Sequence, residues 1–549
     1  MVLNGILEIN YLYQLINKMP IISYNNISSL GLIKDVDPKT LSADDKNGVA
    51  WSDTQNFRFK DGMVSKMPGY ALLIDTTATI TPYFYKRIQS GSNSYYVYCG
   101  LNKIYCQYSL SHYNITRQTT GVDVDYAADS NNQWNYCLLN GLPIFNNGTD
   151  IPQAWTTINQ STRLVNLVGW PTSYKASIIR AYKAYLIALD ITDATPARNQ
   201  NKVKWSNAAL PGALPTSWDI TDPTKDAGEI SLSDSDGYLV DCLPLGDYNI
   251  VYKNTSTYIM SYIGGNQIFS FKKQFPSVGM LAKNCAAVFE GKHFVVTTDD
   301  VIIHDGFTYQ SVIDGKNRKY LFKNISSASA QRTFVVPNYA NNEMWICYPT
   351  GSATYPNNVL VYNYKLNTWS RRLIVETPQI DAGFIDIGSS SIWNTLSTTT
   401  WNNATGTWDN TLYNKNTWML TIVEPFDNHL YLIDQSNFLM EDNNSNYCYL
   451  ERQQLINGDD ENLKLVKRVW PRITKTGGTN NDVDIYIGSG MQTTSTPTWH
   501  GPYLFNTLTD SKIDCMVLGR NISIRFSSNT DIQWSLIGFD LDVDHKGKF

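Results

Sequence analysis

The sequence is poor in charge, in histidine and in long apolar runs, and each shortage excludes a class of protein. Charged residues make up 17% of the 549 residues, below the roughly 25% of an average soluble domain. The net charge of −5 argues against a nucleic-acid reader with a basic face. The 6 histidines include no His-Glu-x-x-His metal pair. No run approaches the roughly 18 apolar residues of a membrane-spanning helix.

The cysteines are also too scattered for cysteine chemistry. All 8 occur singly, without the Cys-x-x-Cys spacing that zinc or redox sites favour. Most lie in short apolar runs that are typical of strands. We therefore expect buried free thiols in a protein assembled in a reducing cytosol, and we predict no metal and no cofactor.

The sequence is rich in short alternating runs of aromatic and β-branched residues. Aromatic residues reach 13% of the chain. Clear examples lie at 95–98, 258–260, 293–296, 359–362 and 484–487. Gly, Asn, Asp and Pro bound these runs, and Asp-Gly pairs supply the positive φ angles of tight hairpins. Helical periodicity is scarce, and 177–189 fits either a helix or a strand pair, so the predicted class is mainly β.

Two segments favour the blades of a β-propeller. Residues 294–306 are typical of two strands joined by a Thr-Asp-Asp turn, and 343–370 of two strands, a turn and an anchoring Trp369. The second ending is similar to that of kelch-type propeller blades. We predict a multidomain, mainly β protein with a propeller-like core, of unknown blade count, and an additional β-sandwich-type domain.

Pattern and composition divide the chain into five predicted segments. They are a disordered extension at 1–18, an N-terminal β segment at 19–80, propeller-like domains at 81–390, a Trp- and Asn-rich loop insertion at 391–446 and a C-terminal β domain at 447–549. Several domains are expected for 549 residues, since domains average roughly 150 residues. The N-terminus lacks the basic leader and cleavage site of a secretory signal.

Two groups of residues are candidate interaction sites. Four tryptophans recur in a background of Asn, Thr and Ser: Trp393, Trp401, Trp408 and Trp418. They form either an irregular loop folded back on one domain or a segment that docks on a partner through buried indoles. Basic doublets occur at two places: Arg371, Arg372, Lys467 and Arg468. We treat them as candidate lumen or rim charges, the alternative being solvated loop charges.

No catalytic motif of defined spacing is present. The sequence lacks a Gly-x-Ser-x-Gly elbow and a phosphate-binding loop. His304-Asp305 resembles a base with its orienting carboxylate, but Asp before Gly is typical of a turn. The acidic pairs at 299–300 and 459–460 could serve a glycosidase, and Trp-rich β proteins bind sugars on ring faces. We predict that the chain is not an enzyme, with a carbohydrate-binding or glycan-cleaving propeller as the alternative.

Several fragments, in order along the chain, carry a resemblance to a known family. They include GLIKDVDP at 31–38, NFRFKDGMV at 56–64, VKWSN at 203–207, RKYLF at 318–322 and IRF at 524–526. These fragments resemble the tail nozzle proteins of short-tailed bacteriophages, also called packaged-DNA stabilisation or tail tubular B-type proteins. The chain departs from that family at its N-terminal extension and in its Asn-rich loops.

The resemblance implies a structural function in the virion tail. Nozzle proteins form a homohexameric ring below the portal and adaptor rings, retain double-stranded DNA without reading its sequence, and carry fibres or spikes around them. A propeller-like domain lies outside, and other β domains line the lumen. The resemblance also implies assembly in the host cytoplasm. A secreted adhesin is a third hypothesis, which a signal peptide would favour.

Overall fold

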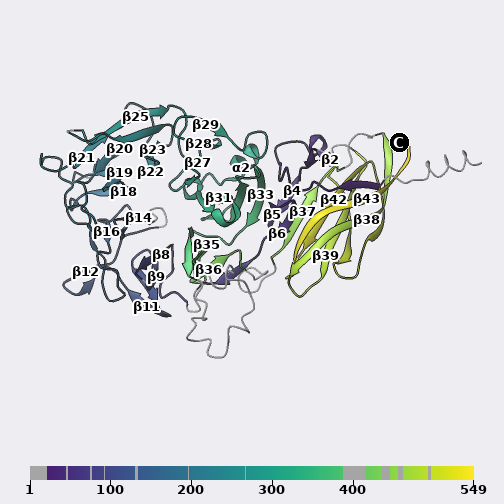
Figure 1. The fold of residues 1–549 in the computed structure, drawn as a ribbon, viewed down its shortest axis with the longest axis horizontal. Coiled ribbons are helices and arrows are strands. Elements are labelled where there is room, and N and C mark those ends of the chain that lie inside the picture. Colours follow the sequence, from purple (N-terminus) through teal and green to yellow (C-terminus); the bar gives the residue numbers. More distant parts are fainter. Residues whose placement is uncertain are drawn as a thin grey trace, which may run out of the picture.

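The computed structural model of the chain describes residues 21–44, 47–73, 77–91, 93–129, 134–195, 197–265, 267–386, 416–435, 446–455, 461–492 and 496–548. They form a β-propeller and a β-sandwich that lie side by side (Figure 1). The mainly β, multidomain fold with a propeller and a sandwich is therefore confirmed. The predicted extension at 1–18 lies outside the described residues.

The described residues contain seven four-stranded antiparallel sheets, the blades of the propeller. From the inner to the outer strand, blades 1 to 4 contain β8 (Phe84–Ser90), β9 (Asn93–Cys99), β10 (Ile104–Tyr108), β11 (Ser111–Asn114); β14 (Asn135–Leu139), β15 (Leu142–Asn146), β16 (Gln153–Ala154), β17 (Val165–Asn166); β18 (Lys175–Tyr182), β19 (Tyr185–Thr192), β20 (Arg198–Trp205), β21 (Gly228–Ser231); and β22 (Leu239–Leu245), β23 (Tyr248–Lys253), β24 (Thr257–Tyr262), β25 (Phe269–Phe275). Blades 5 to 7 contain β26 (Ala286–Phe289), β27 (Lys292–Val296), β28 (Val301–His304), β29 (Tyr309–Ser311); β30 (Phe334–Asn338), β31 (Glu343–Tyr348), β32 (Asn358–Asn363), β33 (Thr368–Leu373); and β34 (Ile380–Asp386), β35 (Asn416–Glu424), β36 (His429–Ile433), β7 (Tyr70–Leu72).

A strand from the beginning of the chain closes the propeller. β7 precedes blade 1 in sequence but pairs antiparallel with β36 of blade 7, where Leu72 lies opposite Tyr431. The inner strands β34 and β8 are in contact, which brings the last blade against the first. Backbone hydrogen bonds thus tie both ends of the propeller segment into one sheet and protect its edge.

The local strand predictions are confirmed in both predicted blade segments. Residues 294–306 contain parts of β27 and β28, and 343–370 contain β31, β32 and most of β33. The anchoring Trp369 is fully buried, and its indole N–H donates to the carbonyl of Val312 at 3.2 Å. Residues 177–189 form the strand pair β18–β19 and not a helix.

The sandwich is built from both ends of the chain. One sheet contains β1 (Ile21–Tyr24), β5 (Phe57–Lys60), β6 (Met63–Lys66), β38 (Asn462–Gly477), β41 (Ile513–Gly519) and β43 (Gln533–Lys548). The other contains β4 (Asp53–Gln55), β37 (Cys448–Arg452), β39 (Asp482–Gly490), β40 (Thr498–Asn506) and β42 (Asn521–Ser528). Trp51, Phe57, Phe526, Trp534 and Phe539 pack in the core between them.

The domain boundaries in space therefore differ from the predicted segments. The N-terminal segment 19–80 is divided, since its strands up to Lys66 join the sandwich and β7 joins blade 7. The segment 391–446 includes β35 and β36, which are blade strands. Both differences arise because strands that are distant in sequence pair with each other.

A few short elements complete the fold. They are the ribbons β2 (Ala43–Asp44) with β3 (Gly48–Val49) and β12 (Gln118–Thr119) with β13 (Val122–Asp123), helix α2 (Arg318–Asn324) and the 3-10 helices η1 (Pro38–Thr40), η2 (Ala330–Arg332) and η3 (Tyr339–Asn341). In the part of the chain that the structure describes, none of the helices has the length and apolar character needed to span a membrane. All 8 cysteines are buried free thiols, as predicted.

Candidate functional site

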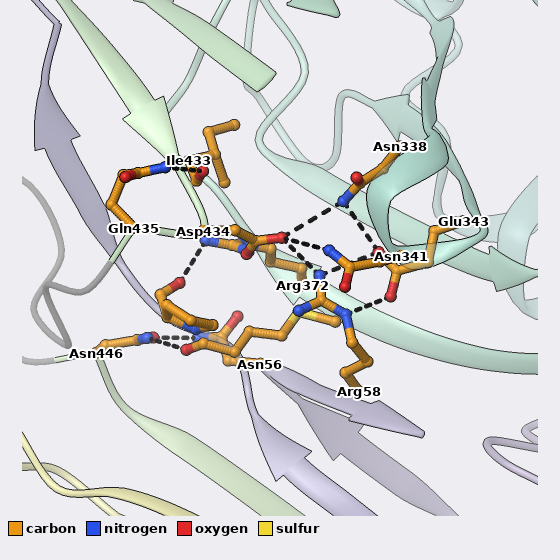
Figure 2. Close-up of polar contacts among 12 residues, drawn as sticks. Asn56, Arg58, Asn338, Asn341, Glu343, Arg372, Ile433, Asp434, Gln435 and Asn446 are labelled. Carbon is orange, nitrogen blue, oxygen red and sulfur yellow. Dashed lines mark hydrogen bonds and ion pairs between the residues drawn. The ribbon is translucent and has the colours of Figure 1, made fainter. Parts of the chain in front are cut away.

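A buried ionic network joins the propeller to the sandwich (Figure 2). Arg58 on β5 of the sandwich donates to Asp434 at 2.6 Å, at the end of β36, and to Glu343 at 3.0 Å, on β31. Arg372 on β33 forms a second ion pair with Asp434. The indole of Trp345 donates to Glu343 at 2.9 Å. The network therefore connects one sandwich strand to blades 6 and 7.

The network balances its own charge. Burial alone would lower the pKa of the Arg58 guanidinium, but the carboxylates of Asp434 and Glu343 outweigh burial and hold that pKa above its usual value. Burial would likewise raise the pKa of Asp434, but Arg58 and Arg372 hold it below its usual value. Two arginines thus face two carboxylates. Such a set is costly to break, because removing one member leaves an uncompensated buried charge.

The N-terminal segment lies across the same junction. The Asp35 carboxylate accepts the backbone N–H groups of Lys319 at 2.6 Å and Tyr320 at 2.8 Å, in the first turn of α2. Further along, Arg452 on β37 donates to the carbonyl of Pro38 at 2.7 Å. This segment is therefore bonded to the propeller and to the sandwich within a few residues, which fixes the two domains relative to each other.

The predicted charges Arg371 and Arg372 lie in this junction. Arg372 is 1% exposed, so it is neither a solvated loop charge nor part of an open surface of the subunit. Arg371 points the other way from the same strand and donates to the carbonyl of Thr54 at 3.1 Å and to the Tyr449 hydroxyl at 2.7 Å. Both arginines thus connect the domains, in place of the lumen or rim position that the sequence led us to expect.

The other predicted charges lie on the sandwich. Lys467 on β38 forms an ion pair with Asp544 at 3.1 Å. Its neighbour Arg468 forms one with Asp514 at 3.3 Å. Both pairs run across adjacent strands, since β38 lies between β41 and β43. Whether this sheet faces a lumen stays a prediction.

Of the four predicted docking tryptophans, the structure describes one. Trp418 lies on β35 of blade 7, where its ring packs on Tyr339 with 4.8 Å between centroids. It also lines the central cavity of the propeller. Trp393, Trp401 and Trp408 lie outside the described residues, so their docking function stays a prediction.

The central cavity is the largest candidate ligand site of the described residues. Its volume is about 490 Å³, within the range of small-molecule sites. The inner strands of all seven blades contribute to its wall: β8, β14, β18, β22, β26, β30 and β34. On one side, Lys86 donates to Asp381 at 2.6 Å, and burial raises the pKa of that carboxyl. The wall combines aromatic rings with charged groups, which is the composition of a binding site.

The acidic residues considered for catalysis have turn functions where they are described. The Asp305 carboxylate accepts the N–H groups of Phe307 at 2.8 Å and Thr308 at 2.7 Å, and these bonds lower its pKa to about 2. Asp300 accepts the Ser311 hydroxyl at 2.7 Å beside the β27–β28 turn. The pair at 459–460 lies outside the described residues. Within those residues, no group of three or more His, Cys, Asp or Glu side chains could hold a metal.

His304 does not act with Asp305 but with a second buried histidine. The Gly306 N–H donates to His304 Nδ1 at 3.1 Å, which leaves the proton on Nε2, 2.6 Å from the Tyr252 hydroxyl. That hydroxyl donates to His293 Nδ1 at 2.7 Å, and His293 Nε2 donates to the carbonyl of Pro244 at 3.0 Å. Every ring nitrogen has a partner only if both imidazoles are neutral. Burial lowers the pKa of His293 to about 4 and of His304 to about 3.

Sequence reasoning missed the junction and the histidine cluster. Arg58 and Asp434 are 376 residues apart, and no local pattern connects them. The one available signal is a charged residue inside a strongly apolar strand, as in Phe57-Arg58-Phe59. Such a charge is buried only if a partner is provided, so it marks a junction without naming the partner.

Comparison with known proteins finds the propeller and nothing closer. No protein-family model matches the chain, and no curated protein does. Hsv2 of Kluyveromyces lactis is 10% identical with a TM-score of 0.30, over 58% of this chain and 97% of that one. AztD of Citrobacter koseri is 11% identical with a TM-score of 0.31, over 59% and 94%. An exo-beta-1,3-galactanase of Phanerochaete chrysosporium is 10% identical with a TM-score of 0.25, over 87% and 99%.

These similarities are too low to carry an argument about function. Hsv2 and AztD have β-propeller-like folds, in agreement with the strand pairing of this chain. None of the three is described as a tail protein, and the galactanase is nearer to the glycan alternative than to a nozzle. What is established is a seven-bladed propeller, within the described residues, joined to a sandwich.

Proposed function

We propose that the chain is a structural subunit of a tail nozzle, a ring-shaped conduit that retains and then releases the DNA of a short-tailed bacteriophage. The observation that supports this best is the buried junction around Arg58 and Asp434. It makes one rigid block of two domains, which suits a subunit that holds its shape under the pressure of packaged DNA. The collinear fragments, from 31–38 to 524–526, supply the resemblance to the family.

In this proposal the subunit acts by shape and involves no catalytic step. Six copies close a ring through repeated side-to-side contacts, next to the adaptor ring and surrounded by fibres or spikes. A conduit should not grip phosphates, since each retained contact slows transit. The pairing of Lys467 with Asp544 and of Arg468 with Asp514 suits such a wall, because it offers DNA balanced charge. The protein would be assembled in the host cytoplasm and act in the virion tail.

Electron microscopy of the assembled protein tests the ring directly. We expect class averages with sixfold symmetry and a central bore at least as wide as a DNA duplex. The reason is that a heterologous interface which closes must generate a ring. A protein that stays monomeric under every assembly condition and cleaves bacterial polysaccharide would rule the nozzle out.

A glycan-binding propeller is the second candidate, and exposed aromatic residues favour it. Phe307 is 58% exposed, and its ring lies 6.0 Å from that of Tyr248 in the neighbouring blade. Tyr309 on β29 is exposed close by in sequence. Exposed rings that converge from two blades offer flat apolar faces of the kind that sugars stack on.

Replacing Phe307 tests this candidate. If the rings bind a glycan, Phe307→Ala should weaken binding roughly tenfold, because the stacking contact is lost. Phe426→Ala is the matched control, since Phe426 is an exposed ring in blade 7, far from Phe307 in the propeller. Binding to a panel of bacterial surface polysaccharides is the measurement. If the native chain binds none of them, or if both variants bind like the native chain, the exposed rings are not a glycan site.

A further inference from the structure

One wall of the propeller cavity holds more positive than negative side chains. Asp241 on β22 is fully buried and receives Arg180 on β18 through two hydrogen bonds of 2.8 and 2.7 Å. Asp190 on β19 receives Arg198 on β20 in the same manner, at 2.8 and 2.5 Å. These two pairs use both carboxylates. The charge of Lys283, which lines the same wall, is therefore left over.

Lys283 is held in this wall with few partners of its own. Its ammonium donates one hydrogen bond, to the carbonyl of Ser177 at 3.3 Å, although an ammonium has three donors. The described residues give it no ion pair. Asp190 and Asp241 act on it only at longer range, and Arg180 and Arg198 oppose them. Burial accordingly lowers the pKa of Lys283. An anion in the cavity would supply both the missing acceptor and the missing charge.

The backbone beside Lys283 is held in an unusual conformation. Asn284 has a φ of 61° and Asp190 a φ of 56°, in the left-handed region that non-glycine residues seldom adopt. Asp190 sits at a bulge of β19, where the pairing register shifts between Leu189 and Ile191. The Asn284 side chain accepts from Arg180 at 2.7 Å, which ties its loop to the charged wall. Bulges and left-handed residues re-aim side chains and cluster at binding sites.

We infer that the central cavity binds a small organic anion, whose carboxylate or phosphate oxygen accepts hydrogen bonds from the Lys283 ammonium. The cavity volume of about 490 Å³ exceeds what an inorganic ion needs and suits a compact molecule. The rings of Tyr136, Tyr238 and Trp418 line the same cavity and provide surface for the body of the ligand. The site lies within one subunit, so this inference does not depend on a ring assembly.

Calorimetric titration of the full chain tests the site with four defined probes. Glucuronate carries a carboxylate, glucose 6-phosphate carries a phosphate, glucose is neutral, and inorganic phosphate lacks an organic body. We expect at least one of the two organic anions to bind, with glucose and inorganic phosphate at least about tenfold weaker, because a charged hydrogen bond and the packed body both contribute. The organic anion that binds identifies the anionic group.

Two variants locate the binding. Lys283→Met should weaken the organic anion at least about tenfold, and Lys283→Gln serves if the first variant does not fold. Lys225→Met is the matched control, since Lys225 is exposed in a loop and does not line the cavity, and it should bind as the native chain does. The inference is overturned if no organic anion binds, if glucose or inorganic phosphate binds equally well, or if the folded Lys283 variant keeps full affinity.

Discussion

Replacing Asp434 with Asn should lower the free energy of unfolding by roughly 3–5 kcal/mol, the cost of breaking a buried ion pair from one side. The substitution leaves Arg58 and Arg372 facing Glu343 alone, so one positive charge is buried without compensation. Asn has nearly the same size as Asp, and both tolerate the left-handed φ of 61° at this position. The change therefore removes charge with little added strain.

Urea unfolding at neutral pH measures this loss. The control is Asp247→Asn, which removes a carboxylate whose side chain is 96% exposed and lies 3.5 Å from Lys183. An exposed pair is worth at most about 1 kcal/mol, so the control should unfold close to the native midpoint. We also expect the sandwich to unfold at lower urea than the propeller in the Asp434 variant, because their main ionic link is weakened. Equal midpoints for the two variants would contradict this account of the junction.

Acidification from pH 7 to pH 5 should cost roughly 4 kcal/mol of stability through His293 and His304. Both imidazoles are neutral in the fold, with pKa values lowered by burial to about 4 and about 3, against about 6.5 in the unfolded chain. The unfolded state therefore binds more protons below pH 6.5. Their contribution to stability is complete above that pH and is lost progressively as the pH falls towards 3.

The hydrogen-bond network supplies the structural reason. A proton added to His293 Nδ1 would oppose the Tyr252 hydroxyl proton, and one added to His304 Nδ1 would oppose the Gly306 N–H. The double variant His293→Gln/His304→Gln should be less stable at pH 8 and lose much less stability between pH 7 and 5. His500→Gln, at an exposed position, should keep the native slope. Chemical unfolding at each pH is the measurement, and an unchanged slope in the double variant would refute the assignment.

Much of the local structure could be predicted from the sequence, because its signals act over a few residues. Alternating runs and Asp-Gly turns located hairpins such as β27–β28. Apolar surroundings predicted that the cysteines are buried. Asp before Gly predicted the turn at Asp305, whose carboxylate caps backbone N–H groups. In each case the physical cause lies within the segment itself.

The candidate sites could not be predicted in the same way. Arg371 and Arg372 alternate on one strand, so they point to opposite faces, but only the neighbouring domain decides that both faces are covered. Lys283 carries no local mark, because its significance comes from Asp190 and Asp241 being already paired. Such features depend on which residues are brought together across several blades.

The sequence by itself determined a mainly β chain of short hairpins with apolar cysteines and no extended helix pattern. The tertiary structure decided how the hairpins were joined: β7 closes blade 7, strands from both ends build the sandwich, and Arg58 meets Asp434 across 376 residues. The physical reason is range. Strand propensity and turn chemistry act between near neighbours, whereas sheet edges, buried charges and cavities are satisfied only when distant segments pack.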